Sequence, residues 1–138
     1  MVLFRANLTR ADLTSANLPR AVLVEADLFR ANLTSAYLHR AFLIEANLTE
    51  ATLFAANLSD AELMRADLSD ANLTGAGNLF DTFGAAVYNA GTDFTNTGFD
   101  PVAAGWVFVP EPDIAALQLA VLLSLAGLRR VHESKRRV

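Results

Sequence analysis

Leucine recurs at every fifth position from Leu3 to Leu73, and this spacing organises the first half of the chain. Alanine stands two places before each of these fifteen leucines, except that Met1 takes the alanine position of the first unit. Five residues advance an α-helix by about 500°, so the leucines would spiral around its axis without forming a face. On a strand, an odd period would send alternate leucines to opposite sides. The pattern therefore predicts a solenoid with walls of five residues and with alanine and leucine inside.

The outward positions repeat over a longer distance, which indicates how many walls make one coil. Threonine follows Leu13, Leu33 and Leu73, and Asn or Asp precedes every fourth leucine from Leu8 to Leu68. The outer surface thus repeats every twenty residues, so four walls form one coil. Fifteen units predict just under four coils, stacked about 4.8 Å apart.

The units Ala6-Asn7-Leu8-Thr9-Arg10 and Ala11-Asp12-Leu13-Thr14-Ser15 resemble the pentapeptide repeat family, whose pattern is A(D/N)LXX. The resemblance runs from Leu3 to Ala76 without a gap and implies a right-handed quadrilateral β-helix. The expected fold is thus an all-β solenoid of about four coils, with an irregular C-terminal cap and one C-terminal α-helix. Its expected parts are the repeats at 1–76, a capping segment at 77–108 and a tail at 109–138.

The repeat phase slips by one residue between Gly75 and Asn78, where the capping segment begins. The following residues mix Gly, Thr and Asn with aromatic side chains and are similar to the closing segment of many bacterial pentapeptide repeats. The aromatic residues are therefore expected in the core or cap, in preference to a ligand-stacking site. They include Tyr88, Phe94, Phe99 and Trp106.

One outward column is almost entirely apolar and forms the candidate contact surface, which we call the apolar stripe. A contiguous apolar patch beyond a few hundred Å² usually marks a contact. Two occupants are open: the C-terminal segment of the chain itself, or a second copy in a homodimer. The first coil has no visible cap either, and a second copy is the expected cover there. The stripe consists of Val2, Phe4, Val22, Val24, Phe42, Ile44 and Met64.

Charge is separated along the repeats, although the net charge is only −4. The first half is rich in arginine and the second half in carboxylates. Such a surface is either simply solvated or orients a partner through opposite potentials. The arginines are Arg5, Arg10, Arg20, Arg30 and Arg40, and the later acidic residues are Glu45, Glu50, Asp60, Glu62, Asp67 and Asp70.

The tail combines a Pro-Glu-Pro motif with an apolar run, Ile114 to Leu128, and a basic end. Asp113 can cap a helix over the run, and a helix apolar all round must be buried in protein or lipid. The order resembles the PEP-CTERM sorting signal of bacterial surface proteins, which implies a membrane or cell-surface location. The chain opens without a signal-peptide pattern, so the alternative is a cytoplasmic protein whose helix packs on the apolar stripe. The candidate sorting motif is Val109, Pro110, Glu111 and Pro112.

Residues for catalysis or cofactor binding are scarce. The chain has no cysteine, which excludes disulfides and thiol chemistry, and its two histidines, His39 and His132, have no evident nucleophile to activate. We therefore predict no catalytic residue, no metal, no cofactor, no small-molecule substrate and no direct binding of nucleic acid.

The resemblance implies a non-enzymatic bacterial protein that acts as a structural or protein-interaction scaffold, with sorting to the membrane or surface by its tail. Two alternatives stay open. One is a DNA mimic that binds or protects DNA gyrase, as some members of the family do. The other is a soluble homodimer with the C-terminal helix packed on the apolar stripe.

Overall fold

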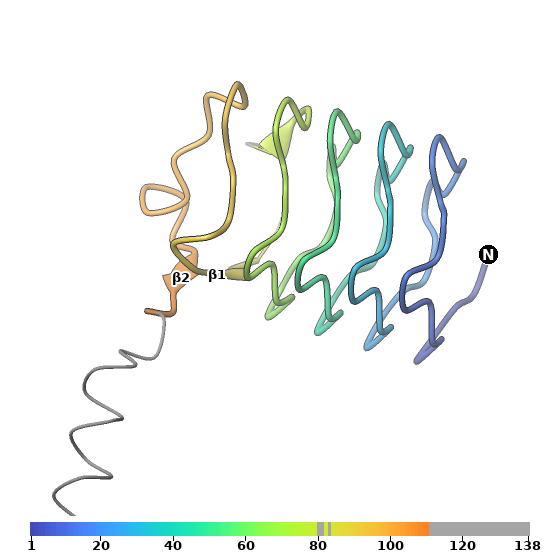
Figure 1. The fold of residues 1–138 in the computed structure, drawn as a ribbon. Coiled ribbons are helices and arrows are strands. Elements are labelled where there is room, and N and C mark those ends of the chain that lie inside the picture. The colour runs from blue at the N-terminus through green and yellow to red at the C-terminus, as the bar shows by residue number, and fades with distance from the viewer. Residues whose placement is uncertain (80–81, 83, 111–138) are drawn as a thin grey trace, which may run out of the picture.

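The computed structural model describes residues 1–79, 82 and 84–110, which wind into a row of stacked loops (Figure 1). The expected C-terminal helix lies outside these residues. Parallel bridges join residues twenty positions apart, so the predicted register of the coils is confirmed. The bridges form four columns, which define faces A to D. Face A carries Val2, Val22, Phe42 and Glu62; face B carries Asn7, Asp27, Asn47 and Asp67; face C carries Asp12, Asn32, Thr52 and Asn72; face D carries Asn17, Tyr37, Asn57 and Gly77.

Regular strands are rarer than an all-β solenoid suggests. The described residues contain two short strands, β1 (Val87–Tyr88) and β2 (Val107–Phe108), which pair in parallel. In the repeats, each unit spends two of its five residues on a turn, so a wall offers one bridged residue between corners. The walls are therefore held by isolated bridges and not by extended ladders.

The corners are β-turns that close on the alanine of the next unit. The amide of Ala6, for example, donates to the carbonyl of Leu3 at 3.1 Å. The third turn residue has φ between 52° and 59° in every unit from Arg5 to Asp70, as the type II turn requires. The four corner columns are named by the faces they join. Corner AB carries Arg5, Glu25, Glu45 and Arg65; corner BC carries Arg10, Arg30, Glu50 and Asp70; corner CD carries Ser15, Ser35, Ala55 and Gly75; corner DA carries Arg20, Arg40 and Asp60.

The core is a column of leucine and alanine along the axis of the coil. From Leu18 to Ala76, the inward residues of the repeats are at most 4% exposed, whereas Leu3, Leu8 and Leu13 of the first coil are only partly buried. Burying one leucine fully contributes about 1.5–3 kcal/mol. The interior therefore supplies most of the stability, and it leaves the outward positions free to vary.

The coil continues past the repeats, on faces B and C. Gly77 bridges Asn57 and Val87 bridges Asp67, each at the twenty-residue spacing, so the bridged column is not displaced at the predicted slip between Gly75 and Asn78. The extra residue lies later, between Val87 and Asp93, because Asp93 bridges Asn72 twenty-one residues away. Trp106 packs edge-on against Phe99, with ring centroids 4.8 Å apart. The predicted core placement of the aromatic residues is confirmed, since Tyr88, Phe99 and Trp106 are buried and Phe94 packs against them.

Candidate interaction surface

The structure brings the seven residues of the apolar stripe together on face A and corner AB. Val2, Val22 and Phe42 form the bridged column of face A, which ends at Glu62. The remaining four residues stack at the corner, because each corner amide donates to a carbonyl one coil further on, as from Glu25 to Ile44 at 2.9 Å. Val2, Phe4 and Met64 are 74%, 49% and 45% exposed, and the others are half-buried. Whether this surface meets a partner stays a prediction.

Charged columns border the stripe on both sides. On corner AB, Arg5 pairs with Glu25 at 2.6 Å, and Glu45 pairs with Arg65. The Glu25 carboxylate raises the pKa of the Arg5 guanidinium. On corner DA, the Arg40 Nε atom lies 3.2 Å from Asp60 Oδ2, and Arg20 forms no ion pair with any residue that the structure describes. The border is therefore charged but mostly paired within the chain.

Some of the charges that the sequence separates into two halves pair vertically between coils. An arginine in one coil reaches the carboxylate twenty residues later, as Arg30 reaches Glu50 at 2.6 Å on corner BC. The Arg30 guanidinium also lies over the Phe29 ring, 4.8 Å from its centroid. Exposed pairs of this kind contribute only about 0–1 kcal/mol each. Two such pairs, Arg30–Glu50 and Arg40–Asp60, therefore join the basic half to the acidic half along the corners.

The Asn/Asp position of the repeat has a structural role that sequence reasoning missed. Asn47 Oδ1 accepts the Thr49 amide at 3.1 Å and the Thr49 hydroxyl at 2.7 Å, and the Asn47 amide group donates to Asp27 one coil earlier at 3.0 Å. Such Asx turns set up the corner that follows. Asn17 makes no such bond, because Pro19 has no N–H to donate. The recurring Asn and Asp in the sequence were the available sign. The same side-chain acceptor is found in Asn7, Asp12, Asp27, Asn32, Asn57, Asp67 and Asn72.

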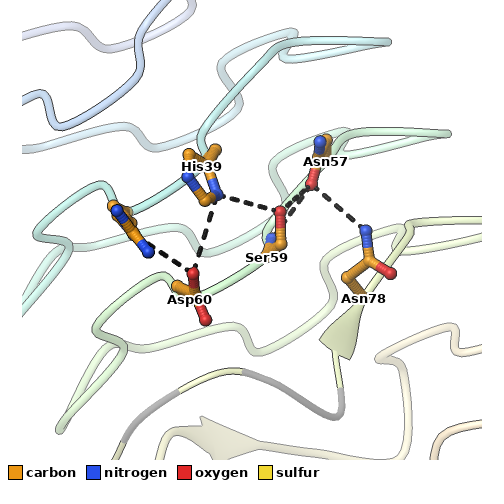
Figure 2. Close-up of polar contacts among 6 residues, drawn as sticks. His39, Asn57, Ser59, Asp60 and Asn78 are labelled. Atoms are coloured by element: carbon orange, nitrogen blue, oxygen red, sulfur yellow. Dashed lines mark hydrogen bonds and ion pairs between the residues drawn. The ribbon is translucent and has the colours of Figure 1, made fainter.

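His39 lies beside a hydroxyl group that the sequence analysis did not identify. Its Nδ1 atom lies 3.2 Å from Ser59 Oγ and 3.9 Å from Asp60 Oδ2 (Figure 2). In a catalytic triad, the serine and the carboxylate use different ring nitrogens, whereas here both approach the same one. The Ser59 hydroxyl donates to Asn57 Oδ1 at 2.6 Å, so it accepts from His39. The group is a hydrogen-bonded chain between coils and lacks the geometry that activates a nucleophile.

A hollow of about 470 Å³ lies in the capping segment, beside Phe99 and Trp106. Asp100 is the one titratable side chain among its described lining residues, so those residues supply no pair of an acid and a base. Elsewhere in the described residues, no group of three or more His, Asp and Glu side chains could hold a metal ion.

Only half of the candidate sorting motif can be placed. Val109 and Pro110 are exposed, and the Val109 amide donates to the Tyr88 carbonyl at 2.8 Å, next to β1. Glu111 and Pro112 lie outside the described residues, as does the apolar run that follows. Within the described part of the chain, no helix has the length and apolar character needed to cross a membrane.

Comparison with known proteins decides the family. The family model for pentapeptide repeats matches residues 6–43 and 46–76 in 8 copies. This chain belongs to the pentapeptide repeat family. Members of the family form right-handed quadrilateral β-helices, in agreement with the four bridged columns.

Solved structures of pentapeptide repeat proteins resemble the chain over most of its length. The protein alr5209 from Nostoc Pcc 7120 is 36% identical, with a TM-score of 0.71, over 77% of this chain and 86% of that one. A pentapeptide repeat protein from the thylakoid lumen of Arabidopsis thaliana is 31% identical, with a TM-score of 0.54, over 68% of each chain. No curated protein matches the chain. These relatives establish the fold and indicate no catalytic family.

Proposed function

We propose that this pentapeptide repeat protein is a non-enzymatic interaction scaffold whose contact surface is the apolar stripe. The observation that carries the proposal is the stacking of the seven stripe residues on one face of a rigid coil, with Val2 still 74% exposed. Leu23 and Leu43 behind the stripe are completely buried, so the core does not need the stripe side chains. Faces B and C, by contrast, carry mostly Asn, Asp and Thr.

The test is a pair of substitutions that make the stripe acidic. In Val24→Asp with Ile44→Asp, the coil stays folded by circular dichroism, and partners that co-purify with the wild type are lost. The matched control is Thr34→Asp with Phe54→Asp, which changes the same turn position in the same two coils on corner CD. The proposal fails when the stripe variant and the control retain the same partners and the same sedimentation profile.

The DNA mimic that acts on DNA gyrase is the main alternative. Mimicry needs a surface of dense negative charge that matches a basic groove. The charged corners instead carry arginine beside carboxylate, as in the Arg5–Glu25 and Arg30–Glu50 pairs, and the stripe is apolar where a mimic needs acid. Dose-dependent change in gyrase supercoiling by the purified protein would favour this alternative over the scaffold.

A further proposal concerns the tail and rests on its sequence. The Val109 to Pro112 motif, the apolar run Ile114 to Leu128 and the basic end together act as a sorting signal or membrane anchor. The full chain is then recovered in the membrane fraction of cells, and deletion of residues 114–128 releases it. Equal recovery of both forms in the soluble fraction contradicts sorting and leaves a cytoplasmic protein, with the run packed on the stripe as the alternative.

A further inference from the structure

We propose that two copies of this chain associate side by side through face A, with their coils parallel and a two-fold axis running along the stack. The inference rests on the proposed function, since it takes the apolar stripe as a contact surface, and it names a second copy as the partner. Three observations carry it: the charges that border face A, the ion pairs within those borders, and a hollow at one border.

We number the levels of face A by its bridged residues, from Val2 at the first level to Glu62 at the fourth. At every level where both borders are described, the two borders carry opposite charges. Arg20 stands across from Glu25, Arg40 from Glu45, and Asp60 from Arg65. Each such pair is five residues apart and therefore lies at the two ends of one wall. The stripe is thus flanked by two charged columns of reversed sign, plus-plus-minus on corner DA and minus-minus-plus on corner AB.

The other faces lack this arrangement. Face B has like charges across two of its levels, Arg5 with Arg10 and Glu45 with Glu50. Faces C and D both border corner CD, whose described residues Ser15, Ser35, Ala55 and Gly75 are uncharged. Only face A therefore combines an apolar centre with borders of opposite sign among the described faces.

Symmetry turns this arrangement into self-complementarity. A two-fold axis along the stack exchanges left and right without changing level, so corner DA of one copy meets corner AB of its partner. Arg20 then meets the partner's Glu25, Arg40 the partner's Glu45, and Asp60 the partner's Arg65, each contact occurring twice. An axis across the stack, centred on the third level, would instead set Arg40 against Arg40 and Glu45 against Glu45. Centred between the third and fourth levels, it would match those charges but leave Arg20 and Glu25 without an opposite charge among the described residues, so only parallel coils match all three levels. The charges thus favour parallel coils.

The existing ion pairs leave room for these contacts. Glu25 binds Arg5 through Oε2, and Glu45 binds Arg65 through Oε1, so each carboxylate has a second oxygen with no partner among the described residues. A carboxylate can accept from two guanidinium groups at once. Arg20, which has no ion pair within the described chain, gains one. The contacts therefore extend the present pairs into a network and break none of them.

A hollow marks the place where the borders would interlock. It has a volume of about 340 Å³ and is lined by Arg40, Phe42, Asp60 and Glu62. The Arg40–Asp60 pair runs along it with positive charge at the third level and negative charge at the fourth. The partner's Glu45–Arg65 pair has the reverse order at the same two levels. The partner's pair therefore fits the hollow with each charge facing its opposite.

The contact is small, so the dimer is weak. Four levels at about 4.8 Å span only about 14 Å along the stack. A contact of that length and one wall wide buries less than the roughly 800 Å² per partner of a standard interface. Glu62 also faces the partner's Glu62 across the two-fold axis, and the repulsion between these like charges disfavours association. Dimerisation is therefore expected in the upper micromolar range, and Glu62→Gln is expected to tighten it several-fold.

The decisive experiment uses two charge reversals that are each harmful alone and compatible together. In sedimentation equilibrium of the full chain up to about 1 mM, Arg20→Glu and Glu25→Arg each raise the dimer dissociation constant about tenfold. An equimolar mixture of the two variants returns to the wild-type value. In the mixed dimer, the reversed charge of one variant meets the reversed charge of the other, and the unchanged Arg20 meets the unchanged Glu25, so both contacts join opposite charges. Arg10→Glu, the same reversal on the diagonally opposite corner BC, keeps the wild-type constant.

Three results would overturn the proposal: a wild type that stays monomeric at about 1 mM, a constant unchanged by Arg20→Glu, or a mixture that fails to recover. Failure here is separable from failure of the scaffold. If the wild type is monomeric but Val24→Asp with Ile44→Asp still abolishes binding of other partners, the apolar stripe remains a contact surface and only the dimer proposal fails. If the stripe variant loses neither its partners nor its self-association, both proposals fail.

Discussion

Gly84 lies directly on Met64: a Cβ added at Gly84 would be 2.7 Å from the Cβ of Met64 and 2.9 Å from its Cα. Gly84 also has φ of +85°, a region that L side chains avoid. The glycine therefore lets the capping segment close over the end of the apolar stripe, where any side chain would push the two backbones apart.

The first prediction follows from this contact. Gly84→Ala lowers the free energy of unfolding by about 2–4 kcal/mol, because backbone strain and a clash with the Met64 backbone add together. Gly75→Ala is the control, since Gly75 also has a positive φ but a Cβ there meets nothing within 4 Å. Its cost is about 1 kcal/mol. Urea unfolding of both variants measures the difference, and equal losses would contradict the role of the contact.

A second prediction separates two asparagines at the same repeat position. Asn47→Ala removes the acceptor of the Thr49 amide and hydroxyl and the bond to Asp27, so it costs about 1–3 kcal/mol of unfolding free energy. Asn17→Ala is close to neutral, because the Asn17 side chain makes no such bonds before Pro19. Thermal unfolding compares the two variants. A similar loss in both would show that the Asx turn adds no stability.

The third prediction concerns the interior of the coil. Leu43→Ala leaves a cavity between completely buried neighbours, Leu23 and Leu63, and lowers the free energy of unfolding by about 2–5 kcal/mol. Leu3→Ala costs less, because Leu3 belongs to the partly exposed first coil. Denaturant titration followed by circular dichroism gives both values. A larger loss at Leu3 would mean that the first coil is the better packed end.

A fourth prediction uses a titration. The Thr14 hydroxyl, at 2.6 Å, and then the Thr14 amide, at 3.1 Å, hold the pKa of Asp12 below its usual range. A lowered pKa in the folded state means that this contribution to stability is complete at neutral pH and is lost as the pH falls through that lowered pKa. Thr14→Val raises the Asp12 pKa measured by NMR, and Thr14→Ser, which keeps a hydroxyl, does not. An unchanged pKa in Thr14→Val would assign the effect to the amide.

The repeat region was the predictable part of the fold, because its interior repeats the same two residues along a single axis. Every unit presents alanine and leucine to the same axis, so the spacing from Leu3 to Leu73 determines the wall length, and the outward residues determine the number of walls. The stripe followed from the same register. No long-range pairing had to be guessed, since each coil touches only its neighbours.

Other features depend on geometry that the repeat does not encode. The spacing of Asn47 and Thr49 does not say which oxygen meets which amide, so the Asx turns were missed. The approach of Ser59 to His39 follows from the twenty-residue register, but the register does not determine that Ser59 and Asp60 approach the same ring nitrogen. The cap replaces leucine by larger rings at Tyr88 and Phe94, and its closure depends on how those rings interlock.

The register of twenty residues constrains how such a protein can change in length. A tandem duplication or deletion of a whole coil leaves Val22 above Val2 and every surface column in place. Gain or loss of a single unit of five keeps the leucine interior intact but rotates everything beyond it by a quarter turn. Face A would then be split between two sides of the rod. Gain or loss of one unit is thus neutral for folding but disruptive for recognition. Related proteins should therefore differ in length by twenty residues far more often than by five.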